Sequence, residues 1–81
     1  MSLYKQLKII EAAKKWRQEH PEHINGVVLI WKNKAYGWKD KLRNPECEQP
    51  GAYAVDIDNN VFIAEGGNDY DGAKCWVVTE N

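Results

Sequence analysis

The stretch "GVVLIWKNKAYGWK", residues 26–39, decides the fold. Val27 to Trp31 is apolar and rich in β-branched side chains, which is typical of a central strand. A polar turn at Asn33-Lys34 follows, and the segment from residue 35 to 38 continues as a second strand. Two strand-like segments joined by a two-residue turn predict a β-hairpin, in which Tyr36 and Trp38 share one face.

A helix is expected before this hairpin. From Ser2 to about Glu19, the apolar residues recur at spacings of three and four, which is typical of an amphipathic helix. Pro21 ends the pattern, because the residue before a proline avoids helical geometry. The predicted apolar stripe consists of Leu3, Leu7, Ile10 and Ala13, with Ile9 and Trp16 on the same broad arc.

Three further strands are expected after the hairpin. The segment from Tyr53 to Ile57 alternates in polarity, and Val61 to Ala64 returns from a turn at residues 58–60. Lys74 to Thr79 supplies the last strand, while residues 39–51 are polar, contain two prolines and form the longest loop. The sequence therefore predicts a single α+β domain over residues 1–81, with one N-terminal helix packed on a curved, mostly antiparallel sheet of about five short strands.

The charges are unevenly distributed along the chain. The net charge is −1, but residues 1–43 hold ten Lys and Arg against four Asp and Glu, giving +6, and residues 44–81 hold one Lys against eight acids, giving −7. If the fold keeps the two sets apart, the molecule is an electrostatic dipole that can orient on a charged partner. If the fold interleaves them, they mean only solubility.

The N-terminal segment predicts a cytoplasmic protein without a membrane partner. Its lysines, at positions 5, 8, 14 and 15, interrupt any apolar stretch long enough for an export signal or a membrane span. In a reducing compartment, Cys47 and Cys75 are expected to be free thiols. Cys75 lies in an apolar strand, where a cysteine is usually a small buried side chain.

Two metal patterns are present and both are incomplete. Asp56, Asp58 and Asn60 match the first, third and fifth positions of a calcium loop, but Val61 stands where glycine is required and Gly67 where glutamate is required. A hairpin turn is therefore the preferred interpretation.

A zinc site is also disfavoured. His20 and His23 have ligand-like spacing, but Cys47 and Cys75 lack the paired short spacing of zinc cysteines. No serine triad, phosphate loop or dinucleotide motif occurs. We therefore expect no metal, no cofactor, no catalytic residues and no enzymatic activity.

The acidic, glycine-rich stretch of residues 65–72 is the first candidate for a binding site. Its carboxylates would repel phosphate, whereas a tyrosine between two carboxylates suits a basic or amide-rich partner. A turn that only joins two strands explains much of the same composition, and the sequence leaves both interpretations open. The expected contact residues are Glu65, Asn68, Asp69, Tyr70 and Asp71, with Gly66, Gly67 and Gly72 permitting the loop shape.

The basic, aromatic hairpin is the alternative candidate. Positive charge interleaved with aromatic rings suits single-stranded nucleic acid. The opposing interpretation is that the aromatic rings belong to the core and that the lysines only protect a sheet edge. The candidate nucleic-acid-binding residues are Lys32, Lys34, Tyr36, Trp38, Lys39, Lys41 and Arg43.

The segments "GVVLIWKNKAYGWKDKLRNP" (26–45), "QPGAYAVD" (49–56) and "VFIAEGGNDYDGA" (61–73) resemble the small antirestriction (ArdR-like) proteins encoded on bacterial plasmids, integrative elements and prophages. The resemblance covers about residues 16–76 and brings no catalytic residues. It implies a role in countering or regulating a host restriction-type defence system. A net charge of −1 does not suit mimicry of DNA over the whole surface.

Composition and resemblance together give the expected function. The chain is expected to be a non-enzymatic module that binds a host-encoded or element-encoded protein through the acidic loop and the proline-bearing loop 39–51. Binding is expected to act by steric occlusion of that protein. The alternative is a small nucleic-acid-binding regulator that uses the basic hairpin. An exposed sheet edge could support a dimer, but the sequence does not indicate which edge is open. The chain is therefore expected to be either a monomer or a dimer.

Overall fold

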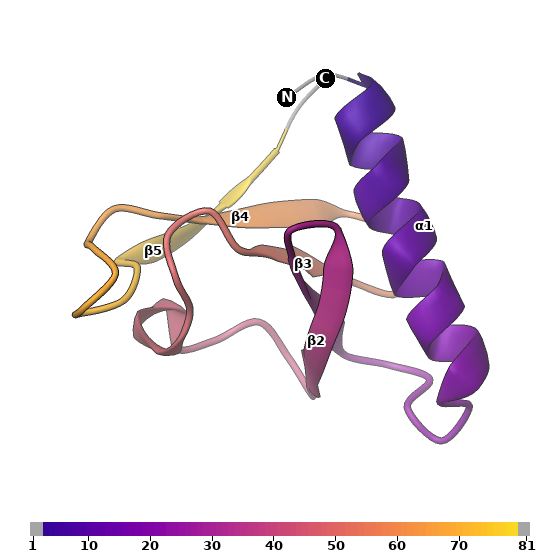
Figure 1. Ribbon diagram of the computed structural model, residues 1–81. Coiled ribbons are helices and arrows are strands. Elements are labelled where there is room, and N and C mark those ends of the chain that lie inside the picture. Colours follow the sequence, from indigo (N-terminus) through magenta and orange to yellow (C-terminus); the bar gives the residue numbers. More distant parts are fainter. Residues whose placement is uncertain (1–2, 80–81) are drawn as a thin grey trace.

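The computed structural model describes residues 3–79, which form one helix and one five-stranded sheet (Figure 1). All the strand pairs are antiparallel, and the strand order is β2-β1-β3-β4-β5. The predicted α+β fold is thus confirmed. Ser2, where the helix was predicted to begin, lies outside the described residues. The elements are α1 (Leu3–Glu19), β1 (Val27–Trp31), β2 (Lys34–Lys39), the 3₁₀ helix η1 (Pro45–Cys47), β3 (Tyr53–Val55), β4 (Val61–Glu65) and β5 (Cys75–Val78).

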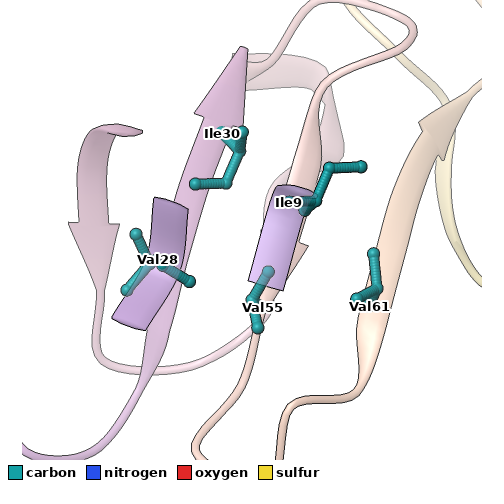
Figure 2. Close-up of a cluster of buried hydrophobic side chains, with 6 residues drawn as sticks. Ile9, Val28, Ile30, Val55 and Val61 are labelled. Atoms are coloured by element: carbon teal, nitrogen blue, oxygen red, sulfur yellow. The ribbon is translucent and has the colours of Figure 1, made fainter. Parts of the chain in front are cut away.

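The main core lies between α1 and one face of the sheet. Ile9 and Ala13 of the helix are fully buried, and Figure 2 shows Ile9 among side chains from three strands. Covering these β-branched residues removes apolar surface from water, which is the main driving force for the fold. The strand residues of this cluster are Val28, Ile30, Val55 and Val61.

The predicted apolar stripe of the helix is partly wrong. Leu3 and Leu7 are 58% and 52% exposed, whereas Ile9, which was placed beside the stripe, is at its centre. Leu7 lies two residues before Ile9, which at 3.6 residues per turn is about 200° around the helix, so Leu7 turns toward solvent when Ile9 faces the sheet. Spacing along the helix therefore identified the apolar arc but not the part of it that the sheet covers.

Arg17 fastens the end of the helix to the sheet. Its guanidinium donates to the carbonyl oxygens of Asn25 (3.3 Å), Gly26 (3.0 Å) and Val55 (3.1 Å). Burial lowers the pKa of Arg17, while the negative charge of Asp56 acts in the opposite direction. One side chain thus satisfies three carbonyl groups where the chain enters β1 and leaves β3.

The first hairpin turns one residue earlier than predicted. Lys32 and Asn33 occupy the turn with φ values of 52° and 66°. Two successive residues with positive φ are required by the tight turns that match the twist of a hairpin. Asparagine tolerates this conformation well, which makes position 33 suited to the turn rather than to its edge.

A β-bulge in β2 changes the faces of the hairpin. Leu29 lies opposite Gly37 and Ile30 opposite Ala35, so Tyr36 is an extra residue without a partner. Trp38 consequently packs in the core beneath α1, while Tyr36 points to the other face. The prediction that Tyr36 and Trp38 share one face is therefore wrong, because the extra residue shifts the alternation by one.

The second face of the sheet is covered by the polar loop that follows β2. Val27, Leu29 and Ala54 are buried on this face, and Leu42 from the loop packs against them. The segment also contains η1, which the sequence did not predict. The loop between β2 and β3 is therefore a third layer of the molecule rather than a free projection.

The second hairpin is shorter than predicted on its first strand. β3 ends at Val55, and Ile57 is 51% exposed within the connecting turn. The carboxylate of Asp56 accepts hydrogen bonds from the main-chain N–H groups of Asp58 (3.0 Å) and Asn60 (2.8 Å). This segment is the turn that the incomplete calcium pattern was taken to be.

Within residues 3–79, no helix is both long and apolar enough to cross a membrane.

We expect Ile9→Ala to lower the free energy of unfolding by about 3 kcal/mol, because it removes a fully buried side chain and leaves a cavity. Urea denaturation followed by circular dichroism measures the loss. The matched control is Leu7→Ala on the exposed part of the same helix, which should change stability by less than about 1 kcal/mol. Equal losses in the two variants would contradict the placement of the core.

Candidate functional site

The loop between β4 and β5 presents an aromatic side chain to solvent. Tyr70 is 95% exposed, and the whole stretch from Glu65 to Asp71 is exposed. Within the described chain, the side chains of Asp69 and Tyr70 form no hydrogen bond or ion pair. The tip of the loop, defined as Asp69 and Tyr70, is therefore free to contact another molecule.

Asn68 organises this loop from within. Its Oδ1 accepts hydrogen bonds from the main-chain N–H groups of Tyr70 (2.9 Å) and Asp71 (2.7 Å). Its Nδ2 donates to the carboxylate of Asp71 (3.2 Å), and its main chain pairs with Gly72 (2.9 and 3.2 Å). Of the five predicted contact residues, Asn68 and Asp71 thus also shape the turn, as asparagine commonly does.

Two glycines at the base of the loop lie too close to main-chain atoms to be replaced. Gly67 and Gly72 have φ values of 73° and 82°, which favour glycine. A Cβ on Gly67 would collide with the carbonyl oxygen of Gly72, and one on Gly72 would collide with that of Glu46. Their predicted role in shaping the loop agrees with this geometry.

The base of the loop rests on the segment that covers the second face. The N–H of Ala73 donates to the carbonyl oxygen of Glu48 (2.9 Å), and Ala73 packs with Ala52 and Ala64 in a buried cluster. This contact also brings Glu46, which is exposed, beside Gly72. The loop is consequently held from two sides, with Glu46 beside Gly72 and the side chain of Lys74 beside Gly66.

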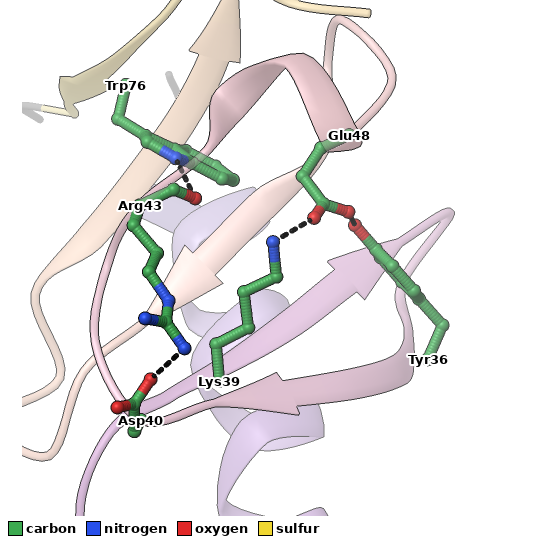
Figure 3. Close-up of polar contacts among 6 residues, drawn as sticks. All are labelled: Tyr36, Lys39, Asp40, Arg43, Glu48 and Trp76. Atoms are coloured by element: carbon green, nitrogen blue, oxygen red, sulfur yellow. Dashed lines mark hydrogen bonds and ion pairs between the residues drawn. The ribbon is translucent and has the colours of Figure 1, made fainter.

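The sequence did not reveal the most buried polar group of the structure. Glu48 is the only charged residue that is buried among those described, with 6% of its side chain exposed. The Tyr36 hydroxyl donates to its Oε1 (2.5 Å), and Lys39 Nζ lies 2.9 Å from its Oε2 (Figure 3). A buried carboxylate with both oxygens satisfied can be stable, whereas an unpaired one is costly.

The same cluster perturbs Tyr36. Burial, the hydrogen bond to Glu48 and the negative charge of Glu48 raise the pKa of Tyr36 well above its ordinary value of 10. Tyr36, Glu48 and Trp31 also line a hollow of about 350 Å³, and the exposed Cys47 is part of the same lining. The only sign of this cluster in the sequence was the position of Glu48 between two prolines of a polar loop.

The structure divides the predicted nucleic-acid-binding residues. Trp38 packs under the helix and donates its indole N–H to the carbonyl oxygen of Asn25 (2.7 Å). Lys39 is paired with Glu48, and Arg43 forms an exposed ion pair with Asp40 (2.8 Å; Figure 3). Three lysines are exposed and form no ion pair within residues 3–79: Lys32, Lys34 and Lys41. Tyr36 is also exposed, but its hydroxyl is bonded to Glu48.

A groove of about 750 Å³ lies between α1 and the first hairpin. It places Lys34, from the predicted basic set, beside three lysines of the helix. No ion pair within residues 3–79 involves any of these four lysines. The charged residues of the groove are Lys8, Lys14, Lys15 and Lys34, with Glu11 and Glu19 among them, and Trp16 lies on its wall.

The two histidines form part of an aromatic stack. Trp16 stacks on His20 (4.0 Å between ring centroids) and on His23 (5.7 Å), and His23 stacks on Trp38 (4.2 Å). The Nδ1 of His20 is also hydrogen-bonded to the carbonyl oxygen of Trp16 (2.8 Å). The described residues include no group of three or more His, Cys, Asp or Glu side chains arranged to hold a metal ion.

Both cysteines are free and exposed. The free state agrees with the prediction from the sequence. The expectation that Cys75 is buried is wrong, because β5 is the outer strand of the sheet and Cys75 lies at its beginning.

The fold separates much of the positive charge from the negative charge. The helix carries five basic and two acidic residues, and the β4–β5 loop, with two acids and one lysine, lies at the opposite side of the molecule (Figure 1). Asp56, beside Arg17, is an exception to this separation.

Comparison with protein-family models, curated proteins and solved structures found no match. The functional argument therefore depends on the sites themselves.

We expect Tyr36→Phe to lower the free energy of unfolding by about 1 kcal/mol at pH 7, because Glu48 loses a hydrogen bond. The raised pKa means that the folded chain keeps this proton after the unfolded chain has released it. Stability from Tyr36 is thus present below about pH 10 and decreases as the pH rises further. Urea unfolding between pH 7 and 11 should show a steeper alkaline decrease for the wild type than for Tyr36→Phe. Equal slopes would contradict the raised pKa of Tyr36.

Proposed function

We propose that this chain is a non-enzymatic protein-binding module that uses the tip of the β4–β5 loop as its main contact. The observation that carries the proposal is Tyr70, which is 95% exposed on a loop held by hydrogen bonds and by close glycine contacts. Tyrosine is enriched among the residues that dominate binding energy at protein interfaces. A tip of this kind suits contact with a protein partner.

The rigidity of the loop supports the proposal. A loop that becomes ordered only on binding loses conformational entropy at that moment, and affinity falls accordingly. Here Asn68 already fixes the main chain of Tyr70 and Asp71. The tip is therefore pre-organised for binding.

The charge around the tip indicates the chemistry of the partner. Asp69 and Asp71 lie in the loop, Glu65 ends β4 just before it, and Glu46 is next to its base, while Lys74 is the one basic residue between β4 and β5. A basic or amide-rich protein surface would complement this group and would be attracted to it over a distance. Together with the resemblance of the sequence to antirestriction proteins, this supports a role in the cytoplasm, on behalf of a mobile genetic element, against a host restriction-type defence protein.

Capture of a partner from a nuclease-treated bacterial lysate tests this function. We expect the wild type to retain a defined protein and Asp69→Ala/Tyr70→Ala to lose it, because both free side chains of the tip are removed. Their removal should change stability by no more than about 0.5 kcal/mol, since neither side chain is bonded within residues 3–79. The matched control is Tyr4→Ala, which removes a tyrosine that is 71% exposed on the helix.

The outcomes separate recognition from a purely structural turn. If Tyr4→Ala and the tip variant lose the partner equally, the tip is not the contact. If the wild type retains no protein, the loop serves only to join β4 and β5. Asn68→Ala should reduce both stability and capture, because it removes the hydrogen bonds that shape the tip.

Nucleic-acid binding is a second candidate function, supported by the groove beside α1. Its four lysines have no ion-pair partner within the described chain, and Trp16 provides an aromatic ring on its wall. Lysines beside an aromatic surface suit the phosphates and bases of a single strand. This candidate relocates the site from the hairpin, where Trp38 and Lys39 are occupied, to the groove.

Titration with a single-stranded oligonucleotide tests this second function. We expect quenching of tryptophan fluorescence and a steep loss of affinity with added salt. Lys15→Glu/Lys34→Glu should weaken binding and reduce the slope of the logarithmic salt plot by about 1.4, since two phosphate contacts are lost. Lys41→Glu, an equivalent change at an exposed residue outside the groove, is the control. Absence of quenching at low salt would rule out this candidate.

A further inference from the structure

The two edges of the sheet differ in how they resist pairing with another chain. The edge strands are β2 and β5 (Figure 1). β2 has Lys34 and Lys39 at its ends and the bulge at Tyr36 between them, and both features hinder the addition of a strand. β5 pairs with β4 in regular register and contains no charge, no proline and no bulge.

The hydrogen bonds of β4 show which main-chain groups of β5 are unpaired. The N–H of Ala64 donates to the carbonyl oxygen of Ala52 (2.9 Å), and the carbonyl oxygen of Ala64 accepts from the N–H of Gly51 (2.8 Å). The main-chain N–H and C=O groups of Ala64 therefore point away from β5. Trp76 lies opposite Ala64 in a pair without hydrogen bonds, so its own N–H and C=O groups point to the open edge. This direction alternates along a strand, so Val78, two residues further on, also directs its N–H and C=O groups to the open edge.

The side chains of β5 are uncharged and incompletely covered. Val77 and Val78 are 38% and 53% exposed, and Cys75 is exposed. Trp76 is partly buried on the face that the β2–β3 loop covers. An exposed, regular and uncharged edge strand of this kind is a ready template for another strand.

We propose that β5 pairs with β5 of a second copy of this chain in an antiparallel arrangement, with a twofold axis at Val77. Trp76 then lies opposite Val78 of the other copy. The N–H and C=O groups of both residues, which are unpaired in the single chain, all find partners on the other strand. Aromatic and β-branched residues are favourable neighbours across strands. The two Val77 side chains face each other in the pair without hydrogen bonds, where side chains come closest.

The charges select this arrangement. The β4–β5 loop, with Asp69 and Asp71, leads into β5. A parallel pair of β5 strands would bring two such loops together, whereas the antiparallel pair places them at opposite ends. The twofold interface is also closed, because the β5 edge of each copy is covered by the β5 edge of the other.

The short strand limits the strength of this dimer. Stable interfaces bury about 800 Å² on each partner, and pairing along a four-residue strand buries less. We therefore expect a dissociation constant on the order of 100 μM, which is typical of weak complexes. The wild type should be largely monomeric when dilute and largely dimeric near 1 mM.

Sedimentation equilibrium of the full chain, from about 10 μM to 1 mM, tests this expectation. A reducing agent is needed because Cys47 and Cys75 are exposed thiols that could form disulfides. The average mass of the wild type should rise toward twice that of one chain. Val77→Lys should remain monomeric, because two like charges then lie directly opposite each other. The matched control Ile24→Lys, at a site that is 67% exposed away from β5, should dimerise like the wild type.

Mixing two variants distinguishes loss of pairing from loss of folding. Val77→Lys and Val77→Glu should each be monomeric alone, and an equal mixture should form a dimer because lysine then lies opposite glutamate. Circular dichroism of each variant confirms that it is folded. A mixture of folded variants that stays monomeric would overturn the register at Val77. A wild type that is monomeric at 1 mM, or an Ile24→Lys variant that is not dimeric, would overturn the interface itself.

Discussion

The extra residue in β2 determines how the rest of the molecule is assembled. Residues 36 and 39 would lie on opposite faces of a regular strand, but the bulge places both Tyr36 and Lys39 on the face away from the helix. There they converge on Glu48, whose burial fixes the β2–β3 loop over the sheet. That loop in turn supports Ala73 at the base of the β4–β5 loop. The bulge in β2 thus helps to position the candidate site, because the loop that Glu48 holds over the sheet also supports the base of the β4–β5 loop.

Local patterns in the sequence were sufficient to identify the helix and the five strands. Periodicity located α1 and the strands, and the break between Trp31 and Ala35 indicated the first hairpin. The sequence did not indicate the bulge, because Tyr36 and Gly37 continue the alternation of a regular strand. Leu3 and Leu7 were misplaced because helical spacing does not show which side of a broad apolar arc turns toward the sheet. These features depend on contacts between distant segments.

The candidate site was only partly foreseeable for the same reason. The glycines, Asn68 and exposed Tyr70 follow from local turn chemistry, so the sequence identified this loop. Glu48 was missed because its importance comes from burial, and a polar loop gave no reason to expect a buried charge. The basic hairpin was divided because Lys39 meets a carboxylate nine positions away and Trp38 enters the core. Composition placed these residues together, but the bulge separated them.

The β4–β5 loop separates the residues that fix its shape from those that give it chemical character. Gly67, Asn68 and Gly72 are constrained by collisions or hydrogen bonds, whereas the side chains at 69 and 70 are not bonded within residues 3–79. Changes at the tip therefore leave the framework intact and alter only what is displayed. If the tip binds a partner as proposed, one or two substitutions there can change its specificity without first requiring a recovery of stability.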